Sequence, residues 1–200
     1  MERKEYSAGM VKLSFWFSEF RKVIQLLNSG KTISEIKEMN LEENIFSAPT
    51  QARAIQIFNT VSTRVKSLDE SFYKLFEQSD ISNQKIIALV AIMQSDSLFF
   101  DFVYEVYREK LIIGVDVLTD SDFNIFFKNK QLQSEKIAKW TDATFNNLKK
   151  SYKTILMGAG VTDRGIGNRK ILKPIIDKSL EDCLLANDME ITLKALSGVR

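Results

Sequence analysis

Only two prolines and eight glycines interrupt this chain of 200 residues. Proline breaks helices and glycine weakens them, so their scarcity leaves room for long, uninterrupted helices. Apolar residues recur at steps of three and four, as in Phe17, Phe20, Val23, Ile24 and Leu27. That spacing is the period of an amphipathic helix. The sequence therefore predicts an all-α protein, built as a helical bundle.

Capping residues and glycines divide the chain into its expected helices. The predicted ranges are 13–28, 34–39, 49–68, 69–78, 82–94, 98–113, 119–130, 134–139, 141–157, 178–186 and 190–196. The helix at 82–94 is nearly all apolar. Because such a helix is buried, we expect it to form a buried central hairpin with the helix at 98–113.

The chain changes character near its C-terminal end. Four glycines between positions 158 and 167 permit turns, and a short β-branched run follows them. This pattern leaves room for a small β wing near residues 161–176. We therefore expect two domains. Residues 1–116 form a helical domain with a helix-turn-helix-like unit and the central hairpin, and residues 117–200 form a basic, winged-helix-like domain.

The net charge is only +2, but it is unevenly distributed. Residues 69–135 hold six basic and twelve acidic side chains, whereas residues 136–173 hold nine basic and two acidic ones. A run of lysines is often only a solvated face. Concentrated in a chain that is acidic elsewhere, this run indicates a surface for a polyanion.

The basic segment has the proportions of a helix-turn-helix, with a short helix, a turn and a longer helix at 141–157. The longer helix should bury one apolar face and direct its polar residues outward, where lysines neutralise phosphates and asparagine reads base edges. A basic loop follows it in the position of a wing. The predicted DNA contacts of this region are Asn146, Lys149, Lys150, Lys153, Arg164, Arg169 and Lys170. The alternative is a solvated lysine face followed by a flexible turn.

A second candidate is the helix at 49–68, which contains no acidic residue. Its expected apolar face is Ile55, Phe58, Val61, Val65 and Leu68. Arg53, Gln56 and Arg64 would then lie on the other side and could contact DNA. The alternative is an ordinary packed amphipathic helix.

Catalysis is not expected, and we predict no catalytic residue, metal or cofactor. The chain has no histidine and a single cysteine, which excludes histidine-based catalysis and His- or Cys-ligated zinc. The pair Asp101 and Glu105 is read as solvated charges rather than as a metal site. No phosphate-binding glycine motif and no small-molecule site are evident. The longest apolar run has eight residues, far below the roughly 20 needed to span a bilayer. We therefore expect a cytoplasmic protein without membrane contact.

Several segments in order along the chain resemble one known family. They are Glu5–Gly9, Leu41–Asn44, Phe99–Glu105, Leu118–Asp122, Ser134–Thr141, Ile171–Ile176 and Asn187-Asp188. Together they are similar to the BrxA proteins of bacterial BREX phage-defence systems. The resemblance spans nearly the whole chain, and it implies a small, helical, DNA-binding BREX component. It assigns no contact residues, so the candidates above come from charge and periodicity alone.

These observations together favour a non-enzymatic protein that binds double-stranded DNA and acts in phage defence with other BREX proteins. Two alternatives stay open. The basic face could dock an acidic patch on a BREX partner, which would make the protein an adaptor. It could also bind structured or single-stranded RNA.

Overall fold

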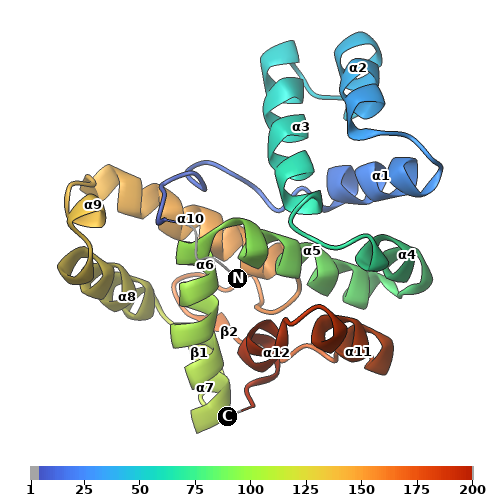
Figure 1. Cartoon of the computed structure of the whole chain (residues 1–200). Coiled ribbons are helices and arrows are strands. Elements are labelled where there is room, and N and C mark those ends of the chain that lie inside the picture. The colour runs from blue at the N-terminus through green and yellow to red at the C-terminus, as the bar shows by residue number, and fades with distance from the viewer. Residues whose placement is uncertain (1–4, 200) are drawn as a thin grey trace. The chain divides into compact units, whose positions relative to one another are not determined.

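The computed structural model describes residues 5–199, and these divide into two compact units (Figure 1). Trp16–Ser95 forms the first unit. Residues 5–15 together with residues 96–199 form the second. The chain therefore passes between the units twice, at Phe15–Trp16 and at Ser95–Asp96. The expected division into domains at residue 116 stays a prediction. The boundaries of the two compact units fall at other positions of the chain.

The first unit consists of five helices. They are α1 (Phe17–Asn28), α2 (Ile33–Glu43), α3 (Gln51–Val65), α4 (Ser71–Gln78) and α5 (Ile81–Ser95). Helix α5 is buried almost throughout, from Ile86 to Met93, and packs against α3 and α4. Phe20 and Phe76 meet with ring centroids 5.6 Å apart, which closes the core between α1 and α4.

Side-chain caps begin several helices of the first unit. Thr32 and Glu35 form a reciprocal capping box at the start of α2. Thr50 accepts a hydrogen bond from the amide of Arg53 and so caps α3. The carboxylate of Asp80 accepts from the amide of Asn83, at 2.7 Å, at the start of α5. That helix was expected to begin at Ser82, because a serine is a good cap, but the charged cap lies two residues earlier.

The first helix also begins later than its apolar pattern indicates. Trp16 has φ 50° and ψ 49°, the left-handed conformation, so α1 cannot extend back through it to Leu13. Residues 13–15 instead continue the N-terminal segment.

The second unit contains the remaining helices. They are α6 (Ser97–Phe102), the π-helical turn η1 (Val103–Tyr107), α7 (Arg108–Ile113), α8 (Asp120–Gln133), α9 (Glu135–Ala138), α10 (Asp142–Gly158), α11 (Lys178–Ala186) and α12 (Glu190–Ser197). Aromatic rings fill its core. Phe102 stacks on Phe123 with centroids 4.5 Å apart, and Phe99 meets Tyr152 edge-on at 4.9 Å.

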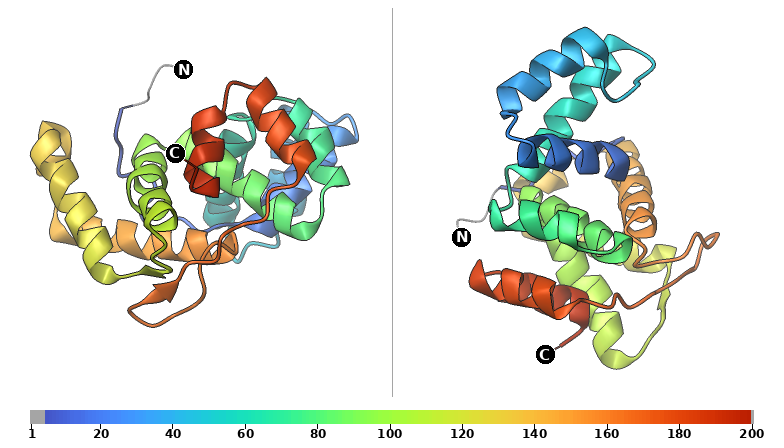
Figure 2. Two further views of the ribbon diagram at one scale, coloured as in Figure 1. Left: turned by 90° about the horizontal axis from the view of Figure 1, so that it is seen from below. Right: turned by 90° about the vertical axis from the view of Figure 1, so that its right-hand side faces the viewer.

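A small β element accompanies these helices. Strands β1 (Val117–Leu118) and β2 (Arg169–Lys170) pair antiparallel, and Thr162 bridges Ile171 on the other side of β2. Figure 2 shows the segment between α10 and α11 leaving the helices as an extended loop. The all-α class with a small β wing is therefore confirmed. Strand β2 precedes the β-branched run at 171–176, where the wing strand was expected. Its partner β1 lies in the short connection between two predicted helices, for which no strand was expected.

The two segments expected to form a central hairpin, 82–94 and 98–113, belong to different compact units, and the hairpin itself stays a prediction. Helix α5 packs within the first unit, while α6, η1 and α7 belong to the second. The apolar composition of 82–94 correctly predicts that α5 is buried, whereas in α7, at the end of the second segment, only Arg108 is buried.

Candidate nucleic-acid interface

Helix α10 is held by its apolar face. Thr141 caps it by accepting a hydrogen bond from the amide of Thr144. Leu148, Tyr152 and Ile155 are completely buried, and burial raises the pKa of Tyr152 well above its ordinary value, with Asp96 adding to the effect. A deeply buried face fixes the rotation of a helix. Asn146 and Lys150 consequently lie on the exposed side.

Lys149 and Lys153 occupy the flank of α10 that faces α8. The ammonium group of Lys149 donates to the side-chain oxygen of Asn124 at 2.9 Å. Lys153 donates to the carboxylate of Asp120 and lies 5.3 Å from the centre of the Phe123 ring. The side chain of Lys153 is only 15% exposed. Two of the predicted phosphate contacts are therefore already engaged within their own unit.

Asp120 interacts with several of the basic residues that the sequence predicts as DNA contacts. The hydrogen bond from Lys153 is the main cause of its lowered pKa, which partial burial opposes, and the charges of Lys149 and Arg169 add to the lowering. The three side chains come from α10 and from β2. The fold thus brings Lys149, Lys153 and Arg169 together, around one carboxylate.

The wing loop is closed by a second aspartate, Asp163. Its Oδ1 accepts hydrogen bonds from the amides of Gly165, at 3.0 Å, and Lys170, at 2.9 Å. The guanidinium of Arg169 donates to the backbone carbonyl of Asp163 at 3.2 Å. Such a network orders the loop from inside and leaves its outer side chains to the solvent.

Gly165 is required at its position in this loop. A Cβ added there would lie 2.0 Å from the carbonyl oxygen of Asn168, which no side chain tolerates. The backbone therefore turns tightly at this point, and the adjacent Ile166 is fully exposed at the tip. The tight turn sets the positions of the basic residues on both sides of it.

Three of the predicted contacts differ from the others. Lys150, Arg164 and Lys170 are all exposed. Within the described range 5–199, none of them takes part in an ion pair, whereas Lys136 of the same basic segment pairs with Glu5 at 3.0 Å. Among the predicted contacts, these three cations, on α10 and on both sides of the wing, are available to an external anion.

The candidates on α3 in the first unit are placed differently from expectation. Arg53 is half-buried, with its guanidinium 4.9 Å from the centre of the Trp16 ring, and it donates to the Gln56 side chain at 2.7 Å. Arg64 is only 2% exposed and lies 5.6 Å from the same ring. The expectation that Arg64 faces outward is wrong.

The buried face of α3 keeps Phe58, Val61 and Val65, as expected, but it extends round the helix to Arg64. Ile55, expected in the core, is 38% exposed, and Ile57 is buried in its place. Both isoleucines fit a helical apolar stripe, so spacing alone does not select between them. The face that α3 exposes consequently includes Asn59, Thr63 and Lys66, which periodicity had not singled out.

The carboxylates of Asp101 and Glu105 in the second unit both contact a lysine. Asp101 is 1% exposed, and the ammonium of Lys130, itself 3% exposed, lies 2.9 Å from Asp101 Oδ2 and 2.6 Å from Glu105 Oε1. The hydroxyl of Tyr6 also donates to Asp101. Reading Asp101 as a solvated charge is therefore wrong. Across residues 5–199 no cluster of three or more His, Cys, Asp or Glu residues could hold a metal ion.

Between residues 5 and 199, no single helix is long and apolar enough to cross a membrane.

The fold and the candidate site define a helical protein of two compact units, one of which carries a basic helix beside a small β wing. The chain belongs to the BrxA family, whose sequence model matches residues 4–188. It is 42% identical to a BREX protein BrxA of Bacillus cereus (strain H3081.97), over 99% of each chain. The resemblance to this family that the sequence suggested is thus confirmed, and the family is that of a BREX system component.

The fold itself has a counterpart among solved structures. A crystal structure of an uncharacterized protein from Magnetospirillum magneticum matches with a TM-score of 0.83. The match covers 98% of this chain and 100% of the other, at 16% sequence identity. At that identity the likeness establishes the fold alone.

Proposed function

We propose that this protein binds double-stranded DNA without catalysing a reaction, and that it acts in BREX phage defence together with other BREX proteins. Membership of the BrxA family supports the BREX role. The DNA-binding part of the proposal rests on the second unit, on α10 and the wing.

The order of elements in the second unit supports its interpretation as a winged helix-turn-helix module. A helical segment precedes β1, helices α8, α9 and α10 follow, and then come the Thr162 bridge, the wing loop and β2. β2 lies between its two antiparallel partners. In such modules the last helix enters the major groove, which is wide enough for one helix, and the wing contacts the neighbouring backbone.

The single observation that carries the proposal is the exposure of Lys150, Arg164 and Lys170 on this helix and wing. Each could neutralise a phosphate, and Asn146, also exposed on α10, could reach a base edge. Lys149, Lys153 and Arg169 would add to the positive electrostatic potential of the surface more than to direct phosphate contacts, because all three already interact with Asp120. In the first unit, Arg53 and Gln56 remain secondary candidates for DNA contact. Arg64 is buried and would contribute to the stability of the core instead.

A charge-reversal pair tests this proposal. Replacing Lys150 and Arg164 by glutamate should weaken binding to a 20-base-pair duplex for every sequence, by at least tenfold at 100 mM salt. The slope of log K against log salt should flatten by about 0.9 for each lost phosphate contact. The double variant Lys74→Glu, Lys128→Glu is the matched control, because it makes the same change in net charge at exposed positions outside the helix and wing.

Equal weakening by the control pair would contradict the assignment of the site. Competition with single-stranded DNA and double-stranded RNA then defines the ligand, since duplex DNA should compete best. A protein that binds no duplex at 50 mM salt, but retains a BREX partner through the same basic residues, would be an adaptor, and the DNA proposal would fail.

A further inference from the structure

Residues of α2, of α3 and of the turn after α3 line an open pocket of about 400 Å³ in the first unit. Ile33 and Phe58 contribute its apolar part. The remaining lining residues are polar or basic: Ser34, Lys37, Asn59, Ser62, Thr63 and Lys66. None of the lining residues is acidic. The volume is within the range of pockets that hold small ligands.

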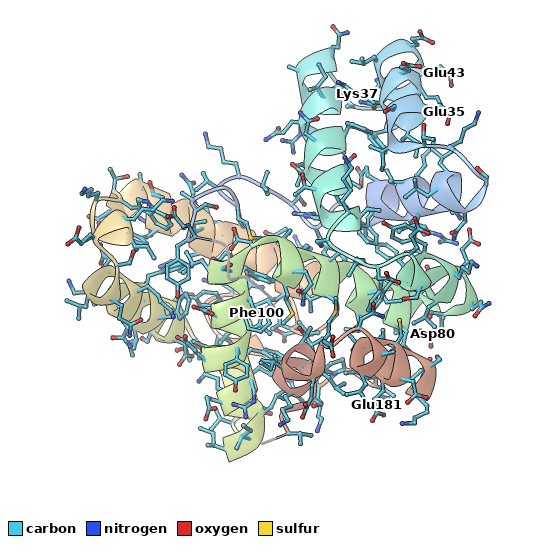
Figure 3. The ribbon with its side chains drawn as sticks, in the orientation of Figure 1. Glu35, Lys37, Glu43, Asp80, Phe100 and Glu181 are labelled. Atoms are coloured by element: carbon cyan, nitrogen blue, oxygen red, sulfur yellow. The ribbon has the colours of Figure 1, made fainter. Side chains whose placement is uncertain are left out.

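The two lysines give the pocket a positive charge that nearby groups do not cancel. In the part of the chain that the structure describes, neither Lys37 nor Lys66 forms an ion pair. Figure 3 shows Lys37 on the side of α2 toward α3 and Glu35 on the far side. The Thr32 amide holds Glu35 in the capping box at 2.7 Å, and the charge of Glu35 is paired with Lys31 at 3.8 Å.

Ser62 provides an independent sign that the pocket takes a ligand. Its side chain is 5% exposed, and its hydroxyl has no hydrogen-bond partner among residues 5–199. Buried hydroxyl groups are normally paired, and a serine within a helix can usually bond to a preceding carbonyl. An acceptor seated in the pocket would satisfy this hydroxyl.

From this geometry we infer that the pocket between α2 and α3 binds a phosphate group. Two ammonium groups match the charge of a phosphate, and the hydroxyl and amide groups of Ser34, Asn59 and Ser62 can donate to its several oxygens. Ser34 also lies in the first turn of α2, where the helix dipole favours an anion. The apolar part formed by Ile33 and Phe58 accommodates the sugar or base of a nucleotide.

The phosphate can come from a free nucleotide or from the backbone of a nucleic acid, and the same pocket chemistry serves both. This site lies on the first unit and uses none of the side chains of α10 or the wing. It can therefore fail or succeed independently of the DNA-binding surface proposed above.

Titration of the ¹⁵N-labelled full-length protein with inorganic phosphate and with AMP tests the inference. The amide signals of Ser34 and Ser62 should shift along saturable curves at millimolar ligand or below. Replacing Lys37 and Lys66 by glutamine should weaken AMP at least tenfold. The control pair Lys31→Gln, Lys74→Gln removes two exposed charges of the same unit outside the pocket and should leave the affinity within twofold.

The Ser62→Ala variant separates ligand binding from folding. Because the hydroxyl has no partner within the protein, its removal should not lower the melting temperature, yet it should weaken AMP about fivefold. Duplex DNA forms the second arm. Loss of AMP affinity alone in Lys37→Gln, Lys66→Gln supports a free nucleotide, and loss of duplex affinity in the same variant supports a backbone phosphate. If neither ligand responds to the pocket lysines, or no amide of the pocket shifts, the inference is wrong.

Discussion

The carboxylate of Asp120 accepts a hydrogen bond from the ammonium group of Lys153, across the interface between α8 and α10. One of the cations predicted to contact DNA is therefore held by an acidic residue of its own unit. The pairing keeps the side chain in place, and it also reduces the positive potential of the surface. The acidic residue thus limits how tightly this surface can bind a polyanion.

Removing that carboxylate should strengthen DNA binding. In Asp120→Asn, we expect duplex affinity to rise about three- to tenfold at 100 mM salt and the salt slope to steepen by up to about 0.9, as Lys153 becomes available for a phosphate. A salt titration by fluorescence anisotropy measures both. Asp182→Asn, which removes an exposed carboxylate on α11, should change neither. Unchanged binding in Asp120→Asn would show that Lys153 does not face the DNA.

Arg64 should matter for stability and not for phosphate contact. It is buried against Trp16, so Arg64→Gln should lower the free energy of unfolding by roughly 2 kcal/mol, from lost cation–π and packing contacts. Urea denaturation measures the loss. The salt slope of DNA binding should stay as in the unchanged protein. A slope that flattens by about 0.9 would instead mark Arg64 as a phosphate contact.

The buried ion pair of Lys130 predicts a larger loss of stability. Lys130→Met leaves the carboxylate of Asp101 nearly fully buried without its cation, which typically costs about 3–5 kcal/mol. Chemical denaturation should show that loss, whereas Lys128→Met, at an exposed position on the same helix, should be nearly neutral. The double variant Lys130→Met, Asp101→Leu should recover part of the stability. A loss below about 1 kcal/mol in Lys130→Met would show that Asp101 does not depend on this cation.

The wing can be distorted without touching a basic residue. Gly165→Ala places a methyl group against the carbonyl of Asn168, so the loop must open. We expect duplex affinity to fall about fivefold or more, with the melting temperature nearly unchanged because the loop lies outside the aromatic core. Ile166→Ala alters the same loop only at its fully exposed tip and should remain within twofold. Normal affinity in Gly165→Ala would remove the wing from the binding surface.

Acid sensitivity follows from carboxyl groups with lowered pKa values, of which Asp80 and Asp120 are two. The backbone hydrogen bond from Asn83 lowers the pKa of Asp80, and the hydrogen bond from Lys153 lowers that of Asp120, from an ordinary value of 3.8. A carboxyl with a lowered folded-state pKa stabilises the fold when ionised, so its contribution is complete above that ordinary value and is lost as the pH falls through the lowered one. Urea midpoints should therefore drop below about pH 4, and less steeply in Asp80→Asn. An equal drop in that variant would contradict the role of Asp80.

Much of the secondary structure is predictable because its signals are local. The caps Thr119 and Thr141 lie at the helix starts that the sequence predicts, since a cap bonds only to residues of its own first turn. The charge of the segment 136–173 is equally readable, because it needs only counting. The family, too, is recognisable from residues in order along the chain.

Contacts between distant residues are decided by the tertiary structure. The partners of Lys153 and Lys130 lie 33 and 29 residues away, and β2 pairs with a strand some fifty residues before it. The exposure of Ile55 in place of Ile57 depends on which neighbours surround α3, and a helical stripe fits either choice. The sequence by itself determined which segments are helical and how much positive charge the segment 136–173 carries. Only the tertiary structure decided which of those charges stay exposed, because an ion pair or a buried face requires elements that the chain brings together by folding.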